Sequence, residues 1–424
     1  MPAIVLKNIT VGGEVRDMLI DAGLISKIEP AGASAAWVTA PGTETMECGG
    51  MVAVPGFVNM HTHAAMSVMR GVGEDVAFHE WLSRIWKLEE NLDADFVYWG
   101  SKVACLEMIK SGTTTFNDQY WFSPSTYRAA MDMGIRPALG YDLMDRNDPA
   151  EAERQKDQCI RKFEEARSSW KGDGVYTLAF HAIYSVSEPM ILWISDFARK
   201  NGVKLHIHLS ETRGEVADCK AAHAGLSPVE YLDSLGVLGP DILAAHTLWL
   251  SEHDIELLGA RGVHCIHNIN SNAKLASGYR FLYNELRDAG ANVCIGTDGC
   301  ASSNNLDMLE AMKTSALFQK AWRDDPKAMP VEELMDCATV NGAKALGLNT
   351  GRIEVGATAD INIVDTQNSW FLSPGSFLAN YIWAAHSECI DSVIAGGRFV
   401  MKHRVVEGER EILDQARKIL SKLS

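Results

Sequence analysis

The stretch Val52-Ala-Val-Pro-Gly-Phe-Val-Asn-Met-His-Thr-His63 is the most informative part of the chain for its fold. Its apolar run from Val52 to Met60 predicts a buried strand, and His61 and His63 follow at the end of that strand. Alternate residues of a strand point to the same side, so both imidazoles can face one ion. The stretch therefore predicts a strand that presents two candidate metal ligands at its C-terminal end.

Strand and helix patterns alternate from about residue 55 to residue 348. Further strands are predicted over residues 113–116, 138–142, 176–180, 204–209, 242–245, 263–266 and 292–295. Eight strands with helices between most of them fit an α/β fold of the (β/α)₈, TIM-like barrel type, whose active site lies at the C-terminal ends of the strands. A doubly wound open sheet is the main alternative, but no Gly-x-Gly-x-x-Gly motif follows the first strand.

Both ends of the chain contain short strand patterns broken by turns, for example at Gly12-Gly13 and in the Gly-Gly pair of residues 392–401. We expect residues 1–54 and 349–424 to form one small composite β-sandwich domain with an amphipathic helix over residues 407–421. Residues 55–348 are expected to form the catalytic barrel.

Composition limits the class of partner. The formal charge is 39 − 55 = −16, which argues against nucleic acid or an anionic membrane as a partner. The nine cysteines contain no Cys-x-x-Cys pair, the N-terminus does not resemble a signal peptide, and no stretch is long and apolar enough to span a bilayer. We therefore expect a cytoplasmic globular protein that acts on a small molecule.

Two further strands offer ligands of the same kind. The fifth reads Lys204-Leu-His-Ile-His-Leu-Ser-Glu211, and His208 is the better ligand because it lies nearer the mouth, with His206 one layer deeper as a hydrogen-bonded core histidine. The eighth strand ends in Asp298, which read alone could equally cap the next helix. His61, His63, His208 and Asp298 together predict a metal site.

Three imidazoles and a carboxylate suit one divalent ion, Zn²⁺ above all, or Fe²⁺. Such an ion can lower the pKa of bound water from about 15.7 to about 7, and Asp298 can accept a proton from that water. A second ion would need a bridging group such as a modified lysine after the fourth strand, and residues 176–185 contain no lysine.

Other polar residues at strand ends are candidates for handling protons. Glu211 lies beyond His208 and is either an exposed loop carboxylate or the group that moves a proton to a ring nitrogen of the substrate. His246 ends the sixth strand and is either a buried structural histidine or the group that polarises the attacking hydroxide. His181 ends the fourth strand and is better suited to hold the substrate; His264 and His267 receive no catalytic role.

These motifs together resemble the amidohydrolase superfamily, and within it the deaminases of 5'-methylthioadenosine and S-adenosylhomocysteine. The resemblance covers nearly the whole chain and implies hydrolytic deamination of an adenine ring, with ammonia and an inosine-type product. 5'-Deoxyadenosine and adenosine are the other nucleosides it leaves open. It is carried by residues 55–71, the His208-Leu-Ser-Glu211 block, Ala245-His246, the His267 segment and residues 296–307.

The resemblance also implies substrate-binding residues. Glu89 matches the glutamate that binds the ribose hydroxyls, and His181 matches the histidine of the family's His-Ala-Pro-Tyr motif. Arg154 resembles the arginine that meets the amino-acid carboxylate of S-adenosylhomocysteine, although an exposed helix arginine fits that position nearly as well. Ile183 and Ile269 replace prolines and Ala273 replaces a methionine of the family pattern, which leaves the preferred 5' substituent open.

Two other functions remain open from the sequence. Related barrels hydrolyse guanine, pterins and s-triazines, but a carboxylate placed for a diol, as Glu89 would be, favours a nucleoside over a flat free base. A non-catalytic binding barrel would be expected to have lost metal ligands, and none is missing here. Self-association into a homo-oligomer is suggested only by analogy with similar barrels.

Overall fold

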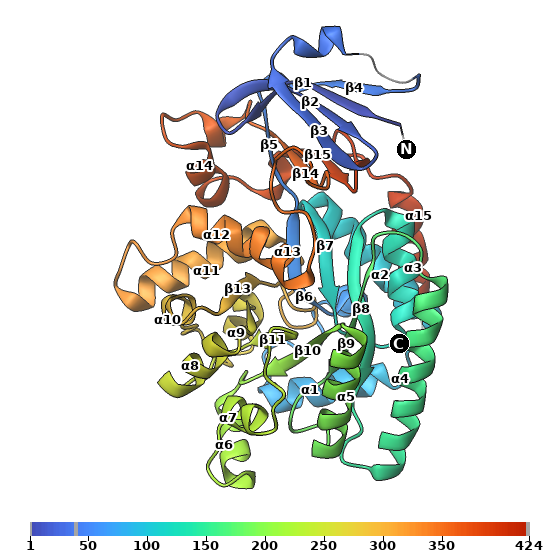
Figure 1. Cartoon of the computed structure of the whole chain (residues 1–424), viewed down its shortest axis with the longest axis vertical. Coiled ribbons are helices and arrows are strands. Elements are labelled where there is room, and N and C mark those ends of the chain that lie inside the picture. Colours follow the sequence, from blue (N-terminus) through green and yellow to red (C-terminus); the bar gives the residue numbers. More distant parts are fainter. Residues whose placement is uncertain (1, 38–40, 421–424) are drawn as a thin grey trace.

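The computed structural model describes residues 2–37 and 41–420 of the chain. Their strands form two sheets: a parallel barrel with helices around it, and a mixed sheet built from both ends of the chain (Figure 1). The mixed sheet lies at one end of the molecule, at the top of Figure 1. The predicted α/β barrel with a separate domain of strands from both ends of the chain is therefore confirmed, and the strands of that domain, expected as a β-sandwich, are hydrogen-bonded into one mixed sheet.

The barrel strands follow one another in chain order around the sheet, all parallel. In the described part of the chain they are β6 (Phe57–Thr62), β7 (Thr113–Asp118), β8 (Arg136–Leu143), β9 (Val175–Phe180), β10 (Lys204–Leu209), β11 (Ile242–His246), β12 (His264–His267) and β13 (Asn292–Ile295). The predicted strand positions agree with these bounds to within a few residues, except at the first strand.

The run Val52–Met60 is not one strand, as the sequence pattern suggested, but two strands that meet at Gly56. Strand β5 (Met51–Pro55) pairs with the terminal sheet, and β6 begins the barrel. A Cβ at Gly56 would lie 2.4 Å from the Thr114 side chain, so only glycine allows the close passage between the two sheets. Apolar periodicity alone does not reveal a change of sheet within a continuous buried run.

The barrel closes between β13 and β6 largely through one side chain. Asn59 donates from Nδ2 to Thr297 Oγ1 (2.7 Å) and accepts from the Thr297 backbone N–H (3.0 Å). The backbone N–H of Asp298 then donates to the carbonyl oxygen of His61 (2.9 Å). This seam brings the end of the last strand against the two histidines of the first.

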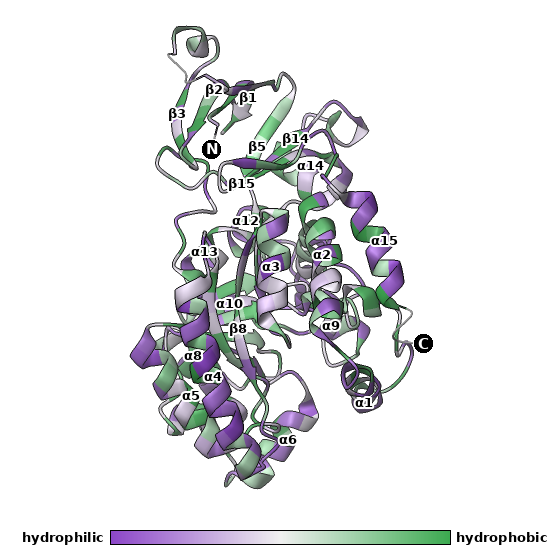
Figure 2. Cartoon of the chain, turned by 90° about the vertical axis from the view of Figure 1, so that its right-hand side faces the viewer, coloured by the Kyte–Doolittle hydropathy of each residue, from purple (hydrophilic) through white to green (hydrophobic). Residues whose placement is uncertain are grey.

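The helices that surround the barrel mostly follow each strand. They are α1 (Phe78–Glu89), α2 (Ala94–Lys110), α3 (Ser123–Met133), α4 (Pro149–Ser169), α5 (Glu188–Asn201), α6 (Arg213–Ala222), α7 (Pro228–Ser234), α8 (Glu252–Ala260), α9 (Ile269–Lys274), α10 (Tyr283–Asp288), α11 (Met308–Arg323), α12 (Val331–Ala338) and α13 (Val340–Leu346). Several have side-chain caps: Asp93 accepts from the N–H of Phe96 before α2, and Ser251 and Asp254 form a capping box at α8. The exposed side of α4 is mostly hydrophilic, as expected for a helix on the outside of a barrel (Figure 2).

The terminal sheet combines strands from both ends of the chain, as predicted. Hydrogen bonds join β1 (Ile4–Val11), β2 (Glu14–Asp21), β3 (Leu24–Pro30), β4 (Glu44–Glu47), β5, β14 (Ile361–Asp365), β15 (Ile390–Ala395) and β16 (Arg398–Met401) into one mixed sheet. Its strands bury a separate apolar cluster that includes Leu6, Ile9 and Met18. The domain limits 1–54, 55–348 and 349–424 stay a prediction, and residues 1, 38–40 and 421–424 within them lie outside the described residues.

Two helices accompany this end of the chain. Helix α14 (Phe377–Trp383) lies between β14 and β15 in the chain, and α15 (Glu409–Leu420) packs on α2 through the buried Ile412, Ala416 and Ile419. Lys110 and Glu409 form an ion pair between α2 and α15 (2.8 Å). The amphipathic helix expected over residues 407–421 is thus α15, and residue 421 lies outside the described range. Within the described residues, no helix combines the length and apolarity needed to cross a membrane.

Candidate metal centre and active site

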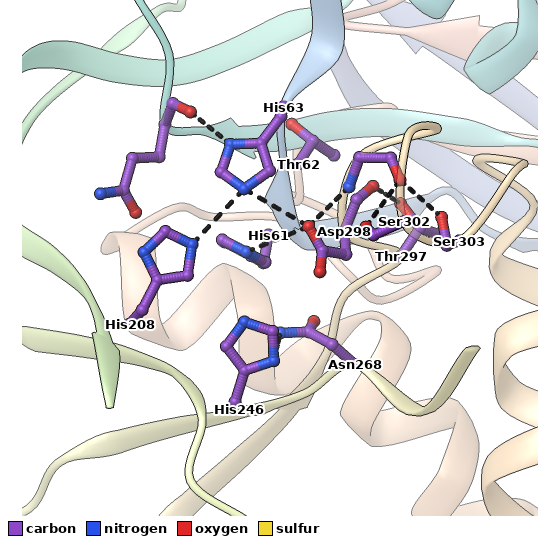
Figure 3. A network of polar contacts seen from close by, with 12 residues as sticks. His61, Thr62, His63, His208, His246, Asn268, Thr297, Asp298, Ser302 and Ser303 are labelled. Atoms are coloured by element: carbon purple, nitrogen blue, oxygen red, sulfur yellow. Dashed lines mark hydrogen bonds and ion pairs between the residues drawn. The ribbon is translucent and has the colours of Figure 1, made fainter. Parts of the chain in front are cut away.

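Histidines and a carboxylate from four barrel strands converge at the C-terminal end of the barrel (Figure 3). Asp298 Oδ1 lies 3.5 Å from His61 Nε2 and 3.3 Å from His63 Nε2. His208 Nε2 lies 3.4 Å from His63 Nε2, and the ligand atoms of His61, His63 and His208 all lie within 4.8 Å of one another. The structure thus brings together the four residues that the sequence pattern suggested as ligands, in a cluster that could hold a metal ion.

The hydrogen bonds of Nδ1 in His63 and His208 show which nitrogen of each ring carries the proton. His63 Nδ1 lies 2.5 Å from the carbonyl oxygen of Gln119, and His208 Nδ1 lies 2.8 Å from that of His181. A carbonyl oxygen only accepts hydrogen bonds, so each Nδ1 carries the proton in a neutral ring. Each Nε2 therefore has its lone pair directed at the centre of the cluster, which is the state a metal ligand requires.

His61 shows the strongest sign that the cluster fits an ion. Its ring is fully buried, and its Nε2 has no hydrogen-bond partner among the described residues. Its Nδ1 lies 2.9 Å from Nε2 of His206, one layer deeper in the barrel, and Asn117 lies 3.0 Å from the other nitrogen of His206. An unpaired buried nitrogen next to a carboxylate and two directed lone pairs matches the donor set of a borderline divalent ion.

Burial and the neighbouring histidines keep the rings of His61, His206 and His208 neutral. Loss of solvation is the largest cause that lowers the pKa of His61 and His208 well below the usual value, followed by neighbouring histidines. The same burial lowers the pKa of His206 to about 3. Neutral imidazole is the form that can ligate a metal, so the site is prepared for one near neutral pH.

His246 has the opposite tautomer. The side-chain amides of Asn272 (3.0 Å) and Asn268 (3.4 Å) donate toward its Nδ1, so Nδ1 is an acceptor and Nε2 carries the proton. This proton faces the cluster, and Glu211 Oε2 lies 3.9 Å from Nε2. Although the His246 nitrogen lies close enough to His61 and Asp298 to be a ligand, its hydrogen bonds make it a donor to an oxygen atom in the site.

Glu211 is buried next to the cluster and is held by its neighbour Glu215. The two carboxylate oxygens of Glu215 accept the backbone N–H groups of Ser210 (2.8 Å) and Glu211 (2.7 Å). Burial raises the pKa of Glu211 well above the usual value, and the charges of Asp298 and Glu215 add to the effect. A carboxyl group that takes up a proton readily in such a place is suited to proton transfer.

Two of these residues occupy a backbone conformation that is uncommon for side chains of their kind. His246, the last residue of β11, has φ of 73°, and Asp298, three residues beyond β13, has φ of 63°, both in the left-handed region. Strain of this kind persists where the surrounding structure imposes it, and it concentrates at functional sites. Here it turns the two side chains into the mouth of the barrel.

A cavity with an aromatic wall opens above the cluster. Helix α1 and the loop after β7 supply most of that wall, which includes Phe78, Trp81, Leu82, Ile85, Trp86, Tyr120 and Trp121. His63, His208, Glu211, His246 and Asp298 form the polar end of the same cavity. The shape suits a flat ring with its reactive edge at the cluster and its faces against aromatic groups.

Two of the predicted substrate residues line this cavity. Glu89, the last residue of α1, has one buried oxygen, Oε1, with no hydrogen-bond partner in residues 2–37 and 41–420, while Oε2 accepts from Trp121 (3.4 Å). His181 follows β9, and its Nδ1 lies 2.8 Å from Ser185 Oγ. Burial raises the pKa of Glu89 and lowers that of His181 to about 3.

Arg154 does not line the catalytic cavity. It lies on α4 in an outer groove, half exposed, and its Nε donates to Glu151 one helical turn away (2.7 Å). This groove shares Glu89, Tyr120, Trp121 and Asp142 with the catalytic cavity, so the two are continuous. His264 and His267 also lie outside the cavity, and His267 stacks on Phe281 with the ring centres 4.1 Å apart.

The family follows from comparison with known proteins. The sequence pattern of the amidohydrolase family matches residues 52–400. The chain belongs to the amidohydrolase family.

Several curated members of this family are similar over most of their length. A 5'-deoxyadenosine deaminase of Methanoregula boonei is 43% identical over 369 residues, which are 87% of this chain and 83% of that protein. A 5-methylthioadenosine/S-adenosylhomocysteine deaminase of Archaeoglobus fulgidus is 40% identical over 375 residues, 88% of each chain.

Solved structures share the architecture. A zinc-bound adenosine deaminase of Xanthomonas campestris superimposes with a TM-score of 0.89 at 30% identity, covering 99% of this chain and 98% of the other. A zinc-bound atrazine chlorohydrolase of Arthrobacter aurescens gives the same TM-score at 20% identity, covering 99% and 100% of the two chains. The second likeness concerns the fold alone.

The amidohydrolase site also contains polar residues that the sequence analysis missed. Gln119 and Asp142 line the cavity, and Gln119 Nε2 donates to Asp142 Oδ1 (3.1 Å). Asp118 accepts from Thr62 Oγ1 (2.8 Å) and from the N–H of Ala64 (2.7 Å), which fixes the turn after His63. Burial raises the pKa of Asp118 to about 6 and that of Asp142 to about 7. All three lie at or just beyond the C-terminal ends of β7 and β8. This position at the strand ends is the feature of the sequence that could have identified them as site residues.

Proposed function

We propose that this amidohydrolase removes the amino group of adenosine-type nucleosides by hydrolysis and releases ammonia and an inosine-type product. One observation carries the proposal: the metal-ligand cluster opens into an aromatic cavity whose wall holds Glu89 with an unpaired acceptor oxygen. The cluster suits hydrolysis, the aromatic wall suits a purine, and the free carboxylate oxygen suits a ribose hydroxyl. The similar deaminases of nucleosides support the same reaction.

His61, His63, His208 and Asp298 would hold one divalent ion, Zn²⁺ or, as the alternative, Fe²⁺. When bound, such an ion supplies the Lewis acidity that makes hydroxide available near neutral pH. The segment 175–185 offers no lysine to bridge a second ion, which favours a single one. Zinc in the similar deaminase structure supports the choice of metal.

The side chains around the cluster divide the proton transfers among them. Asp298 accepts a proton from the attacking water, and Glu211 delivers a proton to a ring nitrogen of the substrate, helped by the raised pKa of its carboxyl group. His246 donates from Nε2–H to the attacking oxygen, because the two asparagine amides fix its tautomer. The amino group takes up a proton and leaves as ammonia, and the ring carbon keeps the new oxygen.

Glu89 and His181 position the nucleoside. Glu89 accepts from the ribose hydroxyls through its unpaired Oε1, and His181 holds the substrate at the edge of the cavity, where its ring lies 6.1 Å from that of Trp86. A free base such as guanine, a pterin or an s-triazine has no hydroxyls for Glu89, so these heterocycles are the less favoured substrates. A non-catalytic binding barrel is disfavoured because the complete ligand and proton-transfer set is present.

Arg154 has a conditional role in this proposal. It would meet the carboxylate of an amino-acid tail, as in S-adenosylhomocysteine, if such a tail entered the outer groove that it lines. Its present partner is Glu151, so tail binding would exchange one carboxylate for another.

The cysteines, all free and buried among the described residues, support a reducing, cytoplasmic location.

A substrate panel tests the function. Metal-replete protein is incubated with S-adenosylhomocysteine, 5'-methylthioadenosine, 5'-deoxyadenosine, adenosine and guanine, while ammonia and the change from adenine to hypoxanthine absorbance are followed. Turnover of nucleosides but not guanine supports the proposal, and Glu89→Gln should lower nucleoside turnover. Chelator-sensitive turnover of guanine or a triazine, with every nucleoside inert, would overturn the substrate class and leave the metal site intact.

A further inference from the structure

Gln119 and Asp142 form a buried polar pair at the junction of the catalytic cavity and the outer groove. Gln119 is 2% exposed and Asp142 is 9% exposed, and both line the cavity. Asp142 also lines the outer groove. The side chain that donates to Asp142 Oδ1 is that of Gln119.

The carboxylate of Asp142 fixes which way the amide of Gln119 faces. Gln119 Nε2 donates to Asp142 Oδ1 (3.1 Å), the arrangement that the ionised form of Asp142 requires, because an ionised carboxylate only accepts hydrogen bonds. The amide oxygen Oε1 is consequently turned away, and it is a buried atom without a hydrogen-bond partner among the described residues. A buried acceptor left unpaired is costly, which is a reason to look for a donor on a ligand.

The pair lies between the metal cluster and the sugar-binding residue proposed above. The backbone oxygen of Gln119 accepts from His63 Nδ1, so Gln119 adjoins the cluster. Glu89 lines the cavity and groove together with Asp142 and, like Gln119, has one unpaired buried acceptor, Oε1. This part of the wall therefore offers two unpaired acceptors. Glu89 Oε1 is assigned to the ribose diol, and the amide oxygen Oε1 of Gln119 remains for another donor of the substrate.

We propose that Gln119, oriented by Asp142, accepts a hydrogen bond from the 5'-hydroxyl of the nucleoside and makes this chain prefer adenosine to 5'-deoxy substrates. The inference rests on the proposed deaminase function and on a sugar placed at Glu89. With the base at the metal cluster and the diol at Glu89, the 5' carbon would point toward the outer groove, past Asp142 and its partner Gln119. A methyl or thioether group at this carbon has no proton to donate and would leave the amide oxygen unpaired.

The test compares kcat/KM for adenosine and 5'-deoxyadenosine. The wild-type protein should favour adenosine by roughly tenfold, since a site built to accept a hydroxyl proton discriminates against an analogue that lacks it. Gln119→Met keeps the side-chain length and removes the acceptor, so the ratio should fall toward one. Asp142→Leu should lower the ratio in the same way by releasing the amide, whereas Asp142→Asn, which can still offer an oxygen to Gln119, should keep most of it.

Tyr141→Phe is the matched control for the substitutions of Gln119 and Asp142. Tyr141 lines the groove but its hydroxyl donates to Gln158 (2.6 Å), so Tyr141→Phe should leave the ratio unchanged. Equal use of both nucleosides by the wild-type protein, which needs no variant, would overturn the inference and leave the deaminase function standing. A ratio unchanged in folded Gln119→Met would do the same. Inertness toward both, with turnover of 5'-methylthioadenosine or S-adenosylhomocysteine, would also overturn the inference. Inertness toward every nucleoside of the panel would instead contradict the proposed function itself.

Discussion

At the scale of single residues, the histidines of the barrel differ in what their Nδ1 atoms contact. Carbonyl oxygens face Nδ1 of His63 and His208, whereas amide N–H groups face Nδ1 of His246. The first arrangement frees the Nε2 lone pair for a metal, and the second places a proton on Nε2. Residues of one type, a few ångströms apart, thereby acquire different chemistry from their hydrogen-bond partners.

Replacing Glu211 tests its part in proton transfer. Glu211→Gln keeps the size of the side chain and its place above Glu215 but removes the acidic proton. We expect kcat for a nucleoside to fall by roughly 10²–10⁴-fold, the usual contribution of a positioned acid or base. Bound metal, measured by elemental analysis, should be unchanged. Glu256→Gln, on the exposed face of α8, is the control, and a kcat equal to that of the wild type would remove Glu211 from the mechanism.

His267 gives a prediction for the pH dependence of stability. Burial lowers its pKa from 6.5 to about 3 in the folded chain, and neither ring nitrogen has a partner among the described residues. Between these values the unfolded chain binds more protons, so the stability that the neutral ring contributes is present above pH 6.5 and is lost as the pH falls.

His267→Phe removes that titration and keeps a ring against Phe281. From about pH 7.5 to about pH 5, the free energy of unfolding of the variant should gain about 2 kcal/mol relative to the wild type. Urea unfolding of both proteins at both pH values measures the difference, and contributions of the other titrating groups cancel. A difference that stays constant with pH would show that His267 is not buried as a neutral ring.

At the scale of elements, helix α1 forms the wall of the cavity. Trp81, Ile85, Trp86 and Glu89 of this helix all line the cavity, and the exposed Lys87 does not. Trp86→Ala should raise KM for a nucleoside by about tenfold, because an aromatic ring that stacks on a base contributes on the order of 1–3 kcal/mol. Lys87→Ala on the same helix is the matched control. An unchanged KM for Trp86→Ala would place the base elsewhere in the cavity.

The elements also show how far the sequence could predict the fold and the site. Apolar runs located the barrel strands. His206 and His208 lie two residues apart and share one face of their strand, so they differ in depth, and His208 was chosen because it lies nearer the end of the strand. The break at Gly56 was missed, since a buried run looks the same whether it stays in one sheet or passes between two. Gln119 and Asp142 were missed because they come together only when β7 and β8 pair. The sequence of either segment alone does not show that its polar residue has a partner in the other.

At the scale of the whole molecule, a buried ion pair joins the barrel to the terminal sheet. Arg136 of β8 donates to Asp360 beside β14 (2.6 Å), and Asp360 also accepts from Thr350 Oγ1 and the Gly396 N–H (2.7 Å each). The side chains of Arg136 and Asp360 are 6% and 0% exposed, so neither can exchange its partner for water. The pair couples the stability of one sheet to the other.

Arg136→Met tests this coupling. The variant leaves the Asp360 carboxylate buried without its counter-charge, and the free energy of unfolding should fall by roughly 3–5 kcal/mol. Lys162→Met removes an exposed ion pair with Glu165 on α4 and should have a much smaller effect in the same urea titration. Equal effects of the two substitutions would show that the buried pair does not hold the sheets together.

Titration of metal-free protein with Zn²⁺, while ammonia release from adenosine and 5'-deoxyadenosine is measured, tests whether one metal ion makes the site active. If His61, His63, His208 and Asp298 hold one catalytic ion, activity should rise from near zero in proportion to added metal and level off at one equivalent per chain. His246→Asn should bind the same one equivalent with little activity. Full activity in the metal-free protein, a plateau at two equivalents, or no ammonia at any metal content would contradict the account.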